Sequence, residues 1–475
     1  MKTSRYLVLT AAFFLCVQNT KASSLLSEQT IGMSLADALY LGLRNNREIR
    51  SAYLQREGQK FDLRVAEDAF KPKLLLKSEY TNIRSSEDQA RQLALTPTAT
   101  LLGQYGTRLN VGWTQQLNHS EQVGHLRSDG INLEIIQPLL RGSGPDVTTA
   151  PLRLARLSEQ ANRLNLKANI SQTVSTIITT YRELIRAQEQ LGIVQASLQR
   201  AQALLTVNKA LINAGRMAQF EIVQTEADIA VQELSVEEAQ NQLDIQRLAL
   251  LRLLALDLST NIQATEAVQA TPLEVDLPQA IHLAQAQQPQ YLSTLLNGQQ
   301  AALDMILAKD AARWDLSLVA GASQVREHPG TGSARRWESY TGLQLEIPIG
   351  DISTRQAQTR ARINVEQQQL LIADARQELE RNVSNVVREL GTRWRQYEIA
   401  LRANELSTRK LDIEREKLSV GRSSNFQIIS FENDLRDAEN ARINALIAYL
   451  NAQTQLDETL GMTLEKWEIA LEGPH

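Results

Sequence analysis

The sequence predicts a mainly α-helical protein with a smaller β-sheet part, built as two internal repeats. Long stretches without proline carry apolar residues at intervals of three or four. Several short segments instead alternate apolar and polar residues. A motif around a Gly-Arg pair also occurs twice, at a constant offset of 206 residues. Together these patterns predict long helical hairpins and a few strands in each half of the chain.

Composition narrows the class of protein. The 475 residues include 50 Lys+Arg and 54 Asp+Glu, a formal net charge of -4. Such a chain has no excess of positive charge to bind the phosphate backbone of a nucleic acid, so we predict no nucleic-acid partner. Beyond the amino terminus no apolar run reaches the roughly 18 residues of a transmembrane helix. This observation does not exclude a membrane β-barrel.

The amino terminus resembles a secretory signal peptide. Lys2 and Arg5 precede an apolar run at residues 6–17, and a cleavage site of the small-residue type follows at Thr20-Lys21-Ala22. This order predicts export and cleavage after Ala22, so residues 1–22 are assigned to a signal peptide. The only cysteine, Cys16, lies in this segment, so the mature chain has no disulfide and no thiolate chemistry.

The duplication defines the organisation of the chain. Gly215-Arg216 aligns with Gly421-Arg422, and each pair is flanked by long helical patterns. The two pairs therefore mark the tips of two helical hairpins. We assign the first repeat to residues 23–271 and the second to residues 272–475.

The first repeat is longer than the second. Leu35 aligns with Leu277 at an offset of 242, about 36 residues more than the offset at the tips. The difference falls within roughly 83–130, where loop-like residues dominate and insertions are tolerated. We interpret this segment as an extra hairpin.

Each repeat has the same predicted order of elements. A helix of about 35 residues comes first, near 34–70 and 278–312, followed by short alternating segments and two very long helices. Residues 352–419 contain no proline and only Gly391. Unbroken, they form a helix of roughly 100 Å. One face of it is apolar, at Ile372, Ala375, Leu379, Val383, Val386, Leu390, Trp394, Tyr397 and Leu401.

The last long helix has two apolar seams. The first comprises Ile428, Phe431, Leu435, Ala438, Arg442, Ala445, Tyr449, Ala452 and Leu456. The second, on a neighbouring face, comprises Ile443, Leu446 and Leu450. Seams on two faces predict partners on both sides, as in a closed ring of helices. A plain coiled-coil core is the alternative.

The alternating segments predict strands at 108–115, 315–323 and 343–349. Aromatic residues lie at these strands or their ends: Tyr80, Trp113, Trp314, Trp337 and Tyr340. Alternating segments with aromatic girdles are typical of outer-membrane barrels. One chain offers about four such strands, too few to close a barrel, so several chains must contribute. A small soluble sheet is the alternative.

No motif predicts catalysis. His119, Glu121 and His125 lie close in sequence, but their spacing does not fit a helical metal pair. Neither a phosphate-loop ending Gly-Lys-Ser/Thr nor a Gly-x-Ser-x-Gly elbow is present. We therefore predict no enzyme, no cofactor and no metal.

Over nearly the whole mature chain, the sequence resembles the TolC family of outer-membrane efflux proteins. The resemblance rests on Ser34-Leu35-Ala36-Asp37-Ala38-Leu39, on Ile136-Gln137-Pro138-Leu139-Leu140-Arg141-Gly142, and on the duplicated Gly-Arg turns. It implies a homotrimer in which each chain gives four strands to a 12-stranded outer-membrane barrel. The long helices then continue into a periplasmic tunnel. The extra hairpin is expected on or beyond the extracellular rim, or in place of a barrel strand.

The resemblance also implies a function. Such proteins are passive exit ducts of efflux pumps or type I secretion systems in the outer membrane of Gram-negative bacteria. They contact outer-membrane lipid and dock with a periplasmic adaptor and an inner-membrane transporter. The docking role transfers to Gly215, Arg216, Gly421 and Arg422. A periplasmic coiled-coil adaptor or structural protein with a small soluble sheet is the alternative function.

The predicted entrance departs from the family. Well-known members carry acidic residues six and nine places after the second glycine, whereas this chain has Gln427 and Ser430. Glu432 and Asp434 follow one turn later. The resemblance therefore implies a polar constriction at these four residues, with weak charge selectivity.

Overall fold

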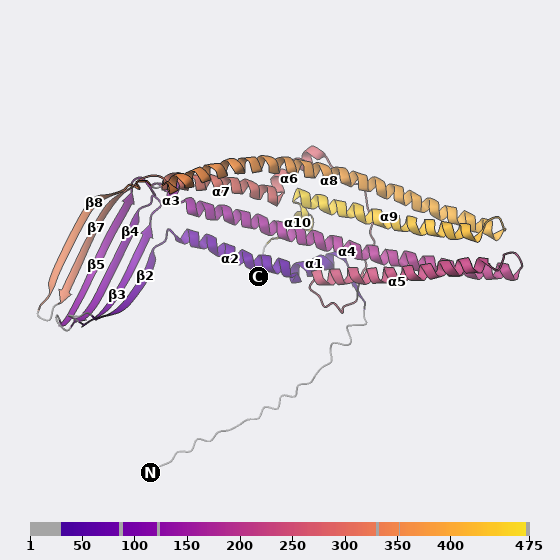
Figure 1. Cartoon of the computed structure of the whole chain (residues 1–475), viewed down its shortest axis with the longest axis horizontal. Helices are drawn as coiled ribbons and strands as arrows, with labels where there is room; N and C mark the ends of the chain where they lie inside the picture. Colours follow the sequence, from indigo (N-terminus) through magenta and orange to yellow (C-terminus); the bar gives the residue numbers. More distant parts are fainter. Residues whose placement is uncertain (1–29, 85–88, 121–123, 329–331, 351, 472–475) are drawn as a thin grey trace, which may run out of the picture. The chain divides into compact units, whose positions relative to one another are not determined.

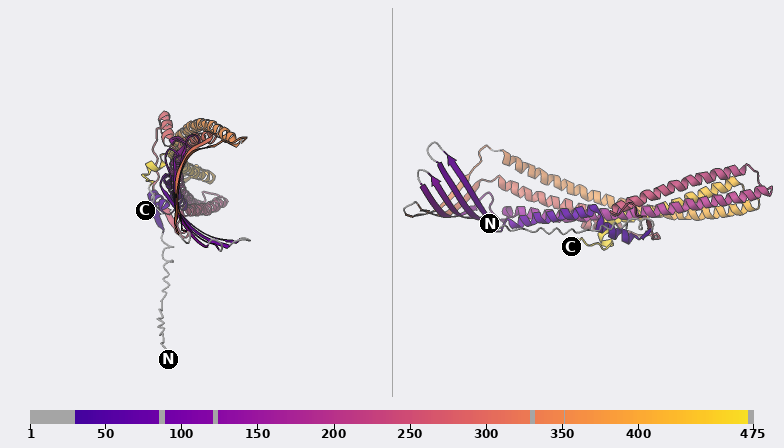
Figure 2. Two further views of the ribbon diagram at one scale, coloured as in Figure 1. Left: turned by 90° about the vertical axis from the view of Figure 1, so that its left-hand side faces the viewer. Right: turned by 90° about the horizontal axis from the view of Figure 1, so that it is seen from below.

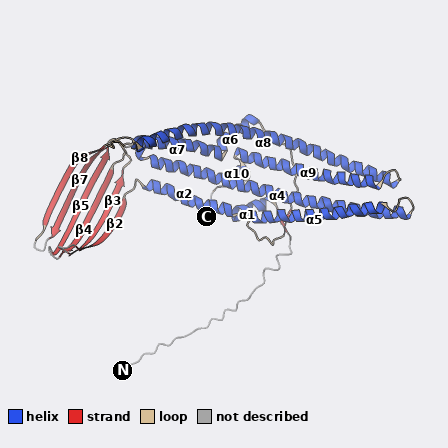
Figure 3. Cartoon of the chain, viewed as in Figure 1, coloured by secondary structure: helices blue, strands red, loops and turns tan. Residues whose placement is uncertain are grey.

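The computed structural model describes residues 30–84, 89–120, 124–328, 332–350 and 352–471. The predicted signal peptide lies outside this part of the chain. The chain forms two compact units. Unit 1 comprises Met1–Asn46, Ile177–Gln269 and Ala403–Asn444, and unit 2 comprises Arg47–Thr176, Ala270–Arg402 and Ala445–His475. Figure 1 follows the elements along the chain, and Figure 3 separates helices from strands.

Unit 1 is helical apart from one small sheet, in which β1 (Ile31–Met33) pairs in parallel with β6 (Ile262–Ala264). Two helices lie wholly within it: α1 (Leu35–Asn45) and α5 (Glu221–Leu253). The other helical segments are the ends of α4 (Ala150–Asn213) and α8 (Ser353–Ser419), and the start of α9 (Asn425–Leu460). The Tyr181 hydroxyl, fully buried, donates a 2.8 Å hydrogen bond to the Met33 carbonyl and ties α4 to β1.

Unit 2 contains one antiparallel sheet in the order β2-β3-β4-β5-β7-β8. Its strands are β2 (Lys73–Arg84), β3 (Gln89–Leu102), β4 (Arg108–Ser120), β5 (Gly124–Pro138), β7 (Asp315–His328) and β8 (Ala334–Glu346). The sheet is curved, as Figure 2 shows. Its helices are α2 (Arg47–Asp68), α3 (Pro145–Thr148), α6 (Leu277–Gln287), α7 (Pro289–Ala311), α10 (Thr463–Lys466) and parts of α4, α8 and α9.

The sheet has six strands where the sequence predicted about four. The additional pair is β3 and β4, which come from the extra segment of the first repeat. Both strands pair along nearly their whole length, with each other and with β2 and β5. The extra hairpin is therefore part of the sheet. Sequence alone did not show this, because pairing partners depend on tertiary structure.

The predicted first helix of each repeat is broken near its middle. The breaks fall at Asn46 and Gln288, which align at the offset of 242. Gln288 has φ -70° and ψ 116°, an extended conformation that its neighbour Pro289 favours. Asn46 has ψ 130°, and its side-chain amide donates a 2.8 Å hydrogen bond to the Leu253 carbonyl. A local break satisfied by a distant carbonyl explains why periodicity alone predicted one continuous helix.

The long helices agree with the sequence. α8 has 67 residues and α4 has 64, about 100 Å each. Both predicted seams of α9 contain buried residues: Ile428, Leu435, Tyr449, Leu456, Ile443, Leu446 and Leu450. In unit 2, Leu379, Val383 and Leu390 of α8 lie in one core cluster with Tyr449. A separate cluster in unit 1 contains Leu411, Leu418, Ile428 and Leu435.

Within the described residues, none of the helices has both the length and the apolar composition that a membrane-spanning helix requires.

Candidate functional site

The two Gly-Arg turns have the same backbone geometry. Gly215 has φ +71° and Gly421 has φ +76°, both in the left-handed region that favours glycine. The amides of Arg216 and Arg422 donate hydrogen bonds of 2.8 and 2.9 Å to carbonyls five residues earlier. The glycine amides bond to carbonyls three residues earlier, at 2.8 and 3.0 Å. Each turn is therefore a Schellman motif, which ends the helix and satisfies its last carbonyls.

The side chains at both turns face solvent. Gly215, Arg216, Gly421 and Arg422 are all exposed, and an added Cβ at either glycine meets no atom within 4 Å. Steric crowding therefore does not require glycine here, but the backbone conformation does. The two turns thus present one exposed arginine each, in the same backbone geometry.

The structure divides the predicted constriction residues between two faces of α9. Gln427, Ser430 and Asp434 follow the i, i+3, i+7 spacing of one helical face. Gln427 and Asp434 are exposed, and Ser430 is half-buried. Glu432 is buried, with 8% of its surface exposed, so it does not share this face.

Glu432 forms the centre of a charge cluster in unit 1. Its carboxylate accepts a 2.7 Å hydrogen bond from Arg200 of α4 and another from Arg415 of α8. Asp434 pairs with Lys410 at 2.7 Å, and the Lys410 ammonium lies 3.6 Å from the centre of the Phe431 ring. Both acids near the predicted entrance thus have cationic partners in the same chain, which weakens the field they project.

Two further acids in this unit have raised pKa values. Burial raises the pKa of Glu439, although Arg200 and Arg442 act in the opposite direction. Burial also raises the pKa of Asp228, and hydrogen bonding to Gln232 partly offsets this. Glu414 shows the reverse, because hydrogen bonds from Ser423 and Lys417 lower its pKa.

A buried polar cluster that sequence reasoning missed lies beside the tips. The Asn208 Nδ2 donates hydrogen bonds of 2.8 Å to the Thr225 hydroxyl and to Asn425 Oδ1. Asn425 Nδ2 in turn lies 3.0 Å from the Thr225 hydroxyl. The three residues are at most 1% exposed. Asn208 stands between Leu204 and Leu211 at seam spacing, and this polar interruption was the available signal.

A pocket of about 640 Å³ lies between the two hairpins of unit 1. Its apolar lining comprises Ala203, Leu204, Val207, Leu211, Leu418 and Ile428. Arg200, Arg415 and Glu432 lie at the same pocket, so the charge cluster borders an apolar surface.

In unit 2 the strand register places apolar residues on one face of the sheet. Along β4 and β5, Leu109 pairs with Ile135, Val111 with Leu133, and Trp113 with Ile131. The same face continues as Leu74 and Leu76 of β2, Leu93, Leu95 and Leu101 of β3, Leu318 of β7, and Leu343 and Leu345 of β8. We call this the apolar face. Many of its side chains are exposed in the single chain.

Four of the five predicted girdle aromatics accord with this face. Tyr80, Trp113 and Trp337 share it, and Trp314 precedes β7 at the end of the sheet that adjoins the helices. Tyr340 lies on the opposite face, because it alternates with Trp337 along β8. Its hydroxyl donates a 3.3 Å hydrogen bond to Glu134, and its ring covers Gly321. The sequence could not assign faces to all five, since the strand bounds were not known.

The histidines of the sheet form no metal site among the described residues. His119 and His125 stack with ring centres 4.1 Å apart across the β4–β5 hairpin, so both lie on strands where the sequence suggested a loop. Glu121 lies outside the described residues.

The same architecture occurs in solved structures of other proteins. No protein-family model and no curated protein sequence matches the chain. Solved structures do match. The Campylobacter jejuni CmeC outer membrane channel aligns with a TM-score of 0.69 at 16% identity, over 91% of this chain and 88% of that chain. The Vibrio cholerae outer membrane protein VceC aligns at 0.68 and 14% identity, over 90% and 96%.

The Neisseria gonorrhoeae MtrE outer membrane channel aligns at a TM-score of 0.67 and 15% identity, over 90% of this chain and 89% of that chain. The chain has the fold of these outer-membrane proteins. Long helices combined with one antiparallel sheet, the predicted fold class, are confirmed.

Proposed function

We propose that this chain is one protomer of a trimeric outer-membrane channel of the TolC type. It would serve as the passive exit duct of a tripartite efflux pump or type I secretion system. The observation that carries the proposal is the apolar face of the sheet in a chain with this fold. An exposed apolar band on a sheet requires a lipid or protein partner.

The dimensions of the band suit a membrane. On the apolar face, leucines begin one residue from the helix-side end of β2, β3, β4 and β8. Apolar positions recur up to nine residues along, at Leu93, Leu117 and Trp337. Nine residues span about 30 Å along a strand. A tilt of about 40° reduces this to roughly 23 Å, close to the height of an outer-membrane apolar band.

The edges of the sheet suit closure by other copies. β2 and β8 are the terminal strands of the described sheet, and every residue of β8 is exposed. Open strand edges are not tolerated in lipid, so β8 of one protomer would pair with β2 of the next. With six strands per chain, three copies give 18 strands rather than 12. Barrel diameter grows with strand number, so this barrel would be wider.

The tips would supply the docking surface. Gly215-Arg216 and Gly421-Arg422 form equivalent exposed Schellman turns, and a duplicated surface suits an adaptor that contacts both hairpins. Such an adaptor would connect the duct to an inner-membrane transporter, which supplies the energy. The duct itself would need no catalytic residue and no cofactor.

The constriction would be polar and weakly charge-selective. Gln427, Ser430 and Asp434 share one face of α9, whereas Arg200 and Arg415 neutralise Glu432. In planar bilayers, a strong block by divalent cations that persisted in Glu432→Ala and Asp434→Ala would contradict this assignment.

The decisive experiment combines oligomeric mass with single-channel conductance for residues 23–475 purified in detergent. We expect a trimer with small, discrete openings. A water-soluble monomer or dimer without conductance would refute the channel and favour a periplasmic coiled-coil adaptor with a small soluble sheet. Retention of the protein in alkaline-washed outer membranes provides an independent check.

A deletion tests the strand number. Removing residues 85–123 excises β3 and β4 and joins the end of β2 directly to the start of β5. We expect a four-strand protomer whose trimer conducts less in its open state than the full chain. Equal open-state conductance would show that the extra hairpin does not widen the pore.

A further inference from the structure

Each of the six strands carries Arg or His at the same level on the apolar face. The position is 11 residues from the helix-side end of the strand. The residues are Arg84, Arg91, His119, Arg127, Arg326 and Arg335. We call them the cationic row. Two residues further along, β5 and β7 add His125 and His328.

The register confirms that these residues share one face. Across neighbouring strands, Leu117 pairs with Arg127 and Arg127 with His328, and Arg326 pairs with Arg335. The row lies just beyond the apolar positions, which end at nine residues. Charge therefore appears at the level where the apolar band stops.

The opposite face has no such row. Among the described residues at this level, its charged side chains are Arg336 and Glu327, which lie 3.9 Å apart as an ion pair. If both faces of the sheet met only water at this level, there would be no physical reason for cations to gather on one face. The excess of cations is confined to the face that carries the apolar band.

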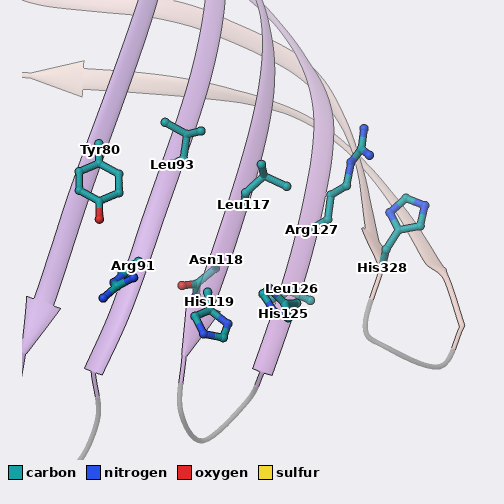
Figure 4. A pocket seen from close by; sticks show the side chains of 10 residues that line it. All are labelled: Tyr80, Arg91, Leu93, Leu117, Asn118, His119, His125, Leu126, Arg127 and His328. Atoms are coloured by element: carbon teal, nitrogen blue, oxygen red, sulfur yellow. The ribbon is translucent and has the colours of Figure 1, made fainter. Parts of the chain in front are cut away.

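A surface pocket of about 370 Å³ lies at the boundary between band and row. Figure 4 shows its lining, contributed by β2, β3, β4, β5 and β7. Leu93 and Leu117 line it together with Arg91, Arg127 and His119. The pocket thus joins an apolar surface to positive charge, as an amphiphilic ligand would require.

The two pocket arginines are available for a ligand. Among the described residues, neither Arg91 nor Arg127 has a carboxylate within 4.0 Å, and both are exposed. Asp129 is the one described acid on the apolar face, and its carboxylate lies 3.8 Å from His328. Guanidinium groups bind phosphate oxygens in a bidentate manner, which makes arginine suited to phosphate recognition.

We propose that the cationic row binds phosphorylated lipid headgroups of the outer leaflet, with the acyl chains against Leu93 and Leu117. This inference rests on the proposed outer-membrane function, which places the far ends of the strands in that leaflet. In a closed assembly the row becomes a continuous belt of cations at headgroup level. The belt fixes the depth of the barrel and recruits a shell of anionic lipid.

The test compares the double variant Arg91→Gln/Arg127→Gln with Arg336→Gln, a matched change at the same level on the opposite face. The probe is diphosphoryl lipid A added to the purified trimer, with native mass spectrometry counting bound lipid. Phosphatidylcholine and inorganic phosphate are the comparison ligands. We expect the double variant to bind lipid A about 30-fold more weakly, from roughly 1 kcal/mol per cation. Arg336→Gln is expected to bind like the wild type.

Three results would overturn the proposal. The first is equal lipid A binding by the double variant and the wild type. The second is equal binding of phosphatidylcholine and lipid A. The third is complete displacement by millimolar phosphate, which would indicate a site for the free anion and not for a lipid.

Oligomeric mass and conductance on the same samples separate the two proposals. If the protein forms a conducting trimer but does not discriminate between the lipids, only the proposal of a headgroup site is refuted. If the protein neither conducts nor forms a trimer, the channel proposal is refuted, and the headgroup site that rests on it is refuted too.

Discussion

Asn208 and Asn425 form a buried amide pair although 217 residues separate them in sequence. Nδ2 of Asn208 donates a 2.8 Å hydrogen bond to Oδ1 of Asn425, and the Nδ2 groups of both residues donate to the hydroxyl of Thr225. Asn208 belongs to α4 of the first hairpin, and Asn425 begins α9, the second helix of the second hairpin. This polar cluster therefore specifies how the two hairpins align near their tips, where apolar seams alone would permit sliding.

Removing this pair is expected to destabilise unit 1. Asn425→Ala leaves Asn208 buried with a lost partner, at a cost of about 1–3 kcal/mol in the free energy of unfolding. Asn213→Ala, at the exposed end of α4, is the control and is expected to change stability by less than about 0.5 kcal/mol. Denaturant unfolding of the detergent-purified protein measures both. Equal stability of the two variants would show that the cluster does not hold the hairpins.

The tip glycines are predicted to be required for their backbone conformation. Gly215→Ala and Gly421→Ala should each destabilise the protein by about 1 kcal/mol, because alanine disfavours positive φ. Gly192→Ala in the exposed middle of α4 should instead stabilise by up to about 1 kcal/mol, since that site is helical and open. Thermal unfolding compares the signs. Stabilisation by both kinds of substitution would contradict the Schellman assignment.

The Glu432 cluster should contribute more than the exposed pair beside it. The Glu432 side chain is 10% exposed, whereas that of Asp434 is 50% exposed. A double-mutant cycle of Arg415→Gln with Glu432→Gln should give a coupling of about 1–3 kcal/mol. The same cycle for Lys410 and Asp434 should give less than about 1 kcal/mol. A larger coupling energy for Lys410 and Asp434 than for Arg415 and Glu432 would contradict this prediction.

The raised pKa of Asp228 predicts a pH dependence of stability. Burial makes the folded state bind a proton more tightly than the unfolded state, in which the pKa is near 3.8. The free energy of unfolding should therefore fall as pH rises from that value through the raised pKa. Asp228→Asn should reduce this loss, and Glu226→Gln on the exposed surface should not. Unfolding measured between pH 4 and pH 8 tests it, and an identical slope in Asp228→Asn would refute it.

Adjacent residues of β5 should differ sharply in their tolerance of charge. Leu133 lies on the apolar face and Asn132 on the other face of the same strand. Leu133→Arg should cost about 2–4 kcal/mol in lipid, whereas Asn132→Arg should be nearly neutral. The yield of folded trimer in outer membranes gives the readout. Similar yields would mean that the apolar face does not contact lipid.

The sequence by itself determined the classes and lengths of the main elements. The run of residues without proline predicted α8 to within one residue. The spacing of three or four predicted both seams of α9, which contain buried residues because a helical face must bury its apolar stripe. The repeated Gly-Arg pairs located both turns, since few residues other than glycine adopt positive φ. These features depend on local conformation, which neighbouring residues specify.

Only the tertiary structure decided the remainder. Long-range strand pairing placed β3 and β4 within the sheet and packed the ring of Tyr340 in β8 over Gly321 in β7. It also brought cations from six strands into one row. Packing between hairpins buried Asn208 against Asn425 and turned Glu432 away from the exposed face of α9. Each of these facts depends on register or packing between distant segments, which the pattern within one segment does not contain.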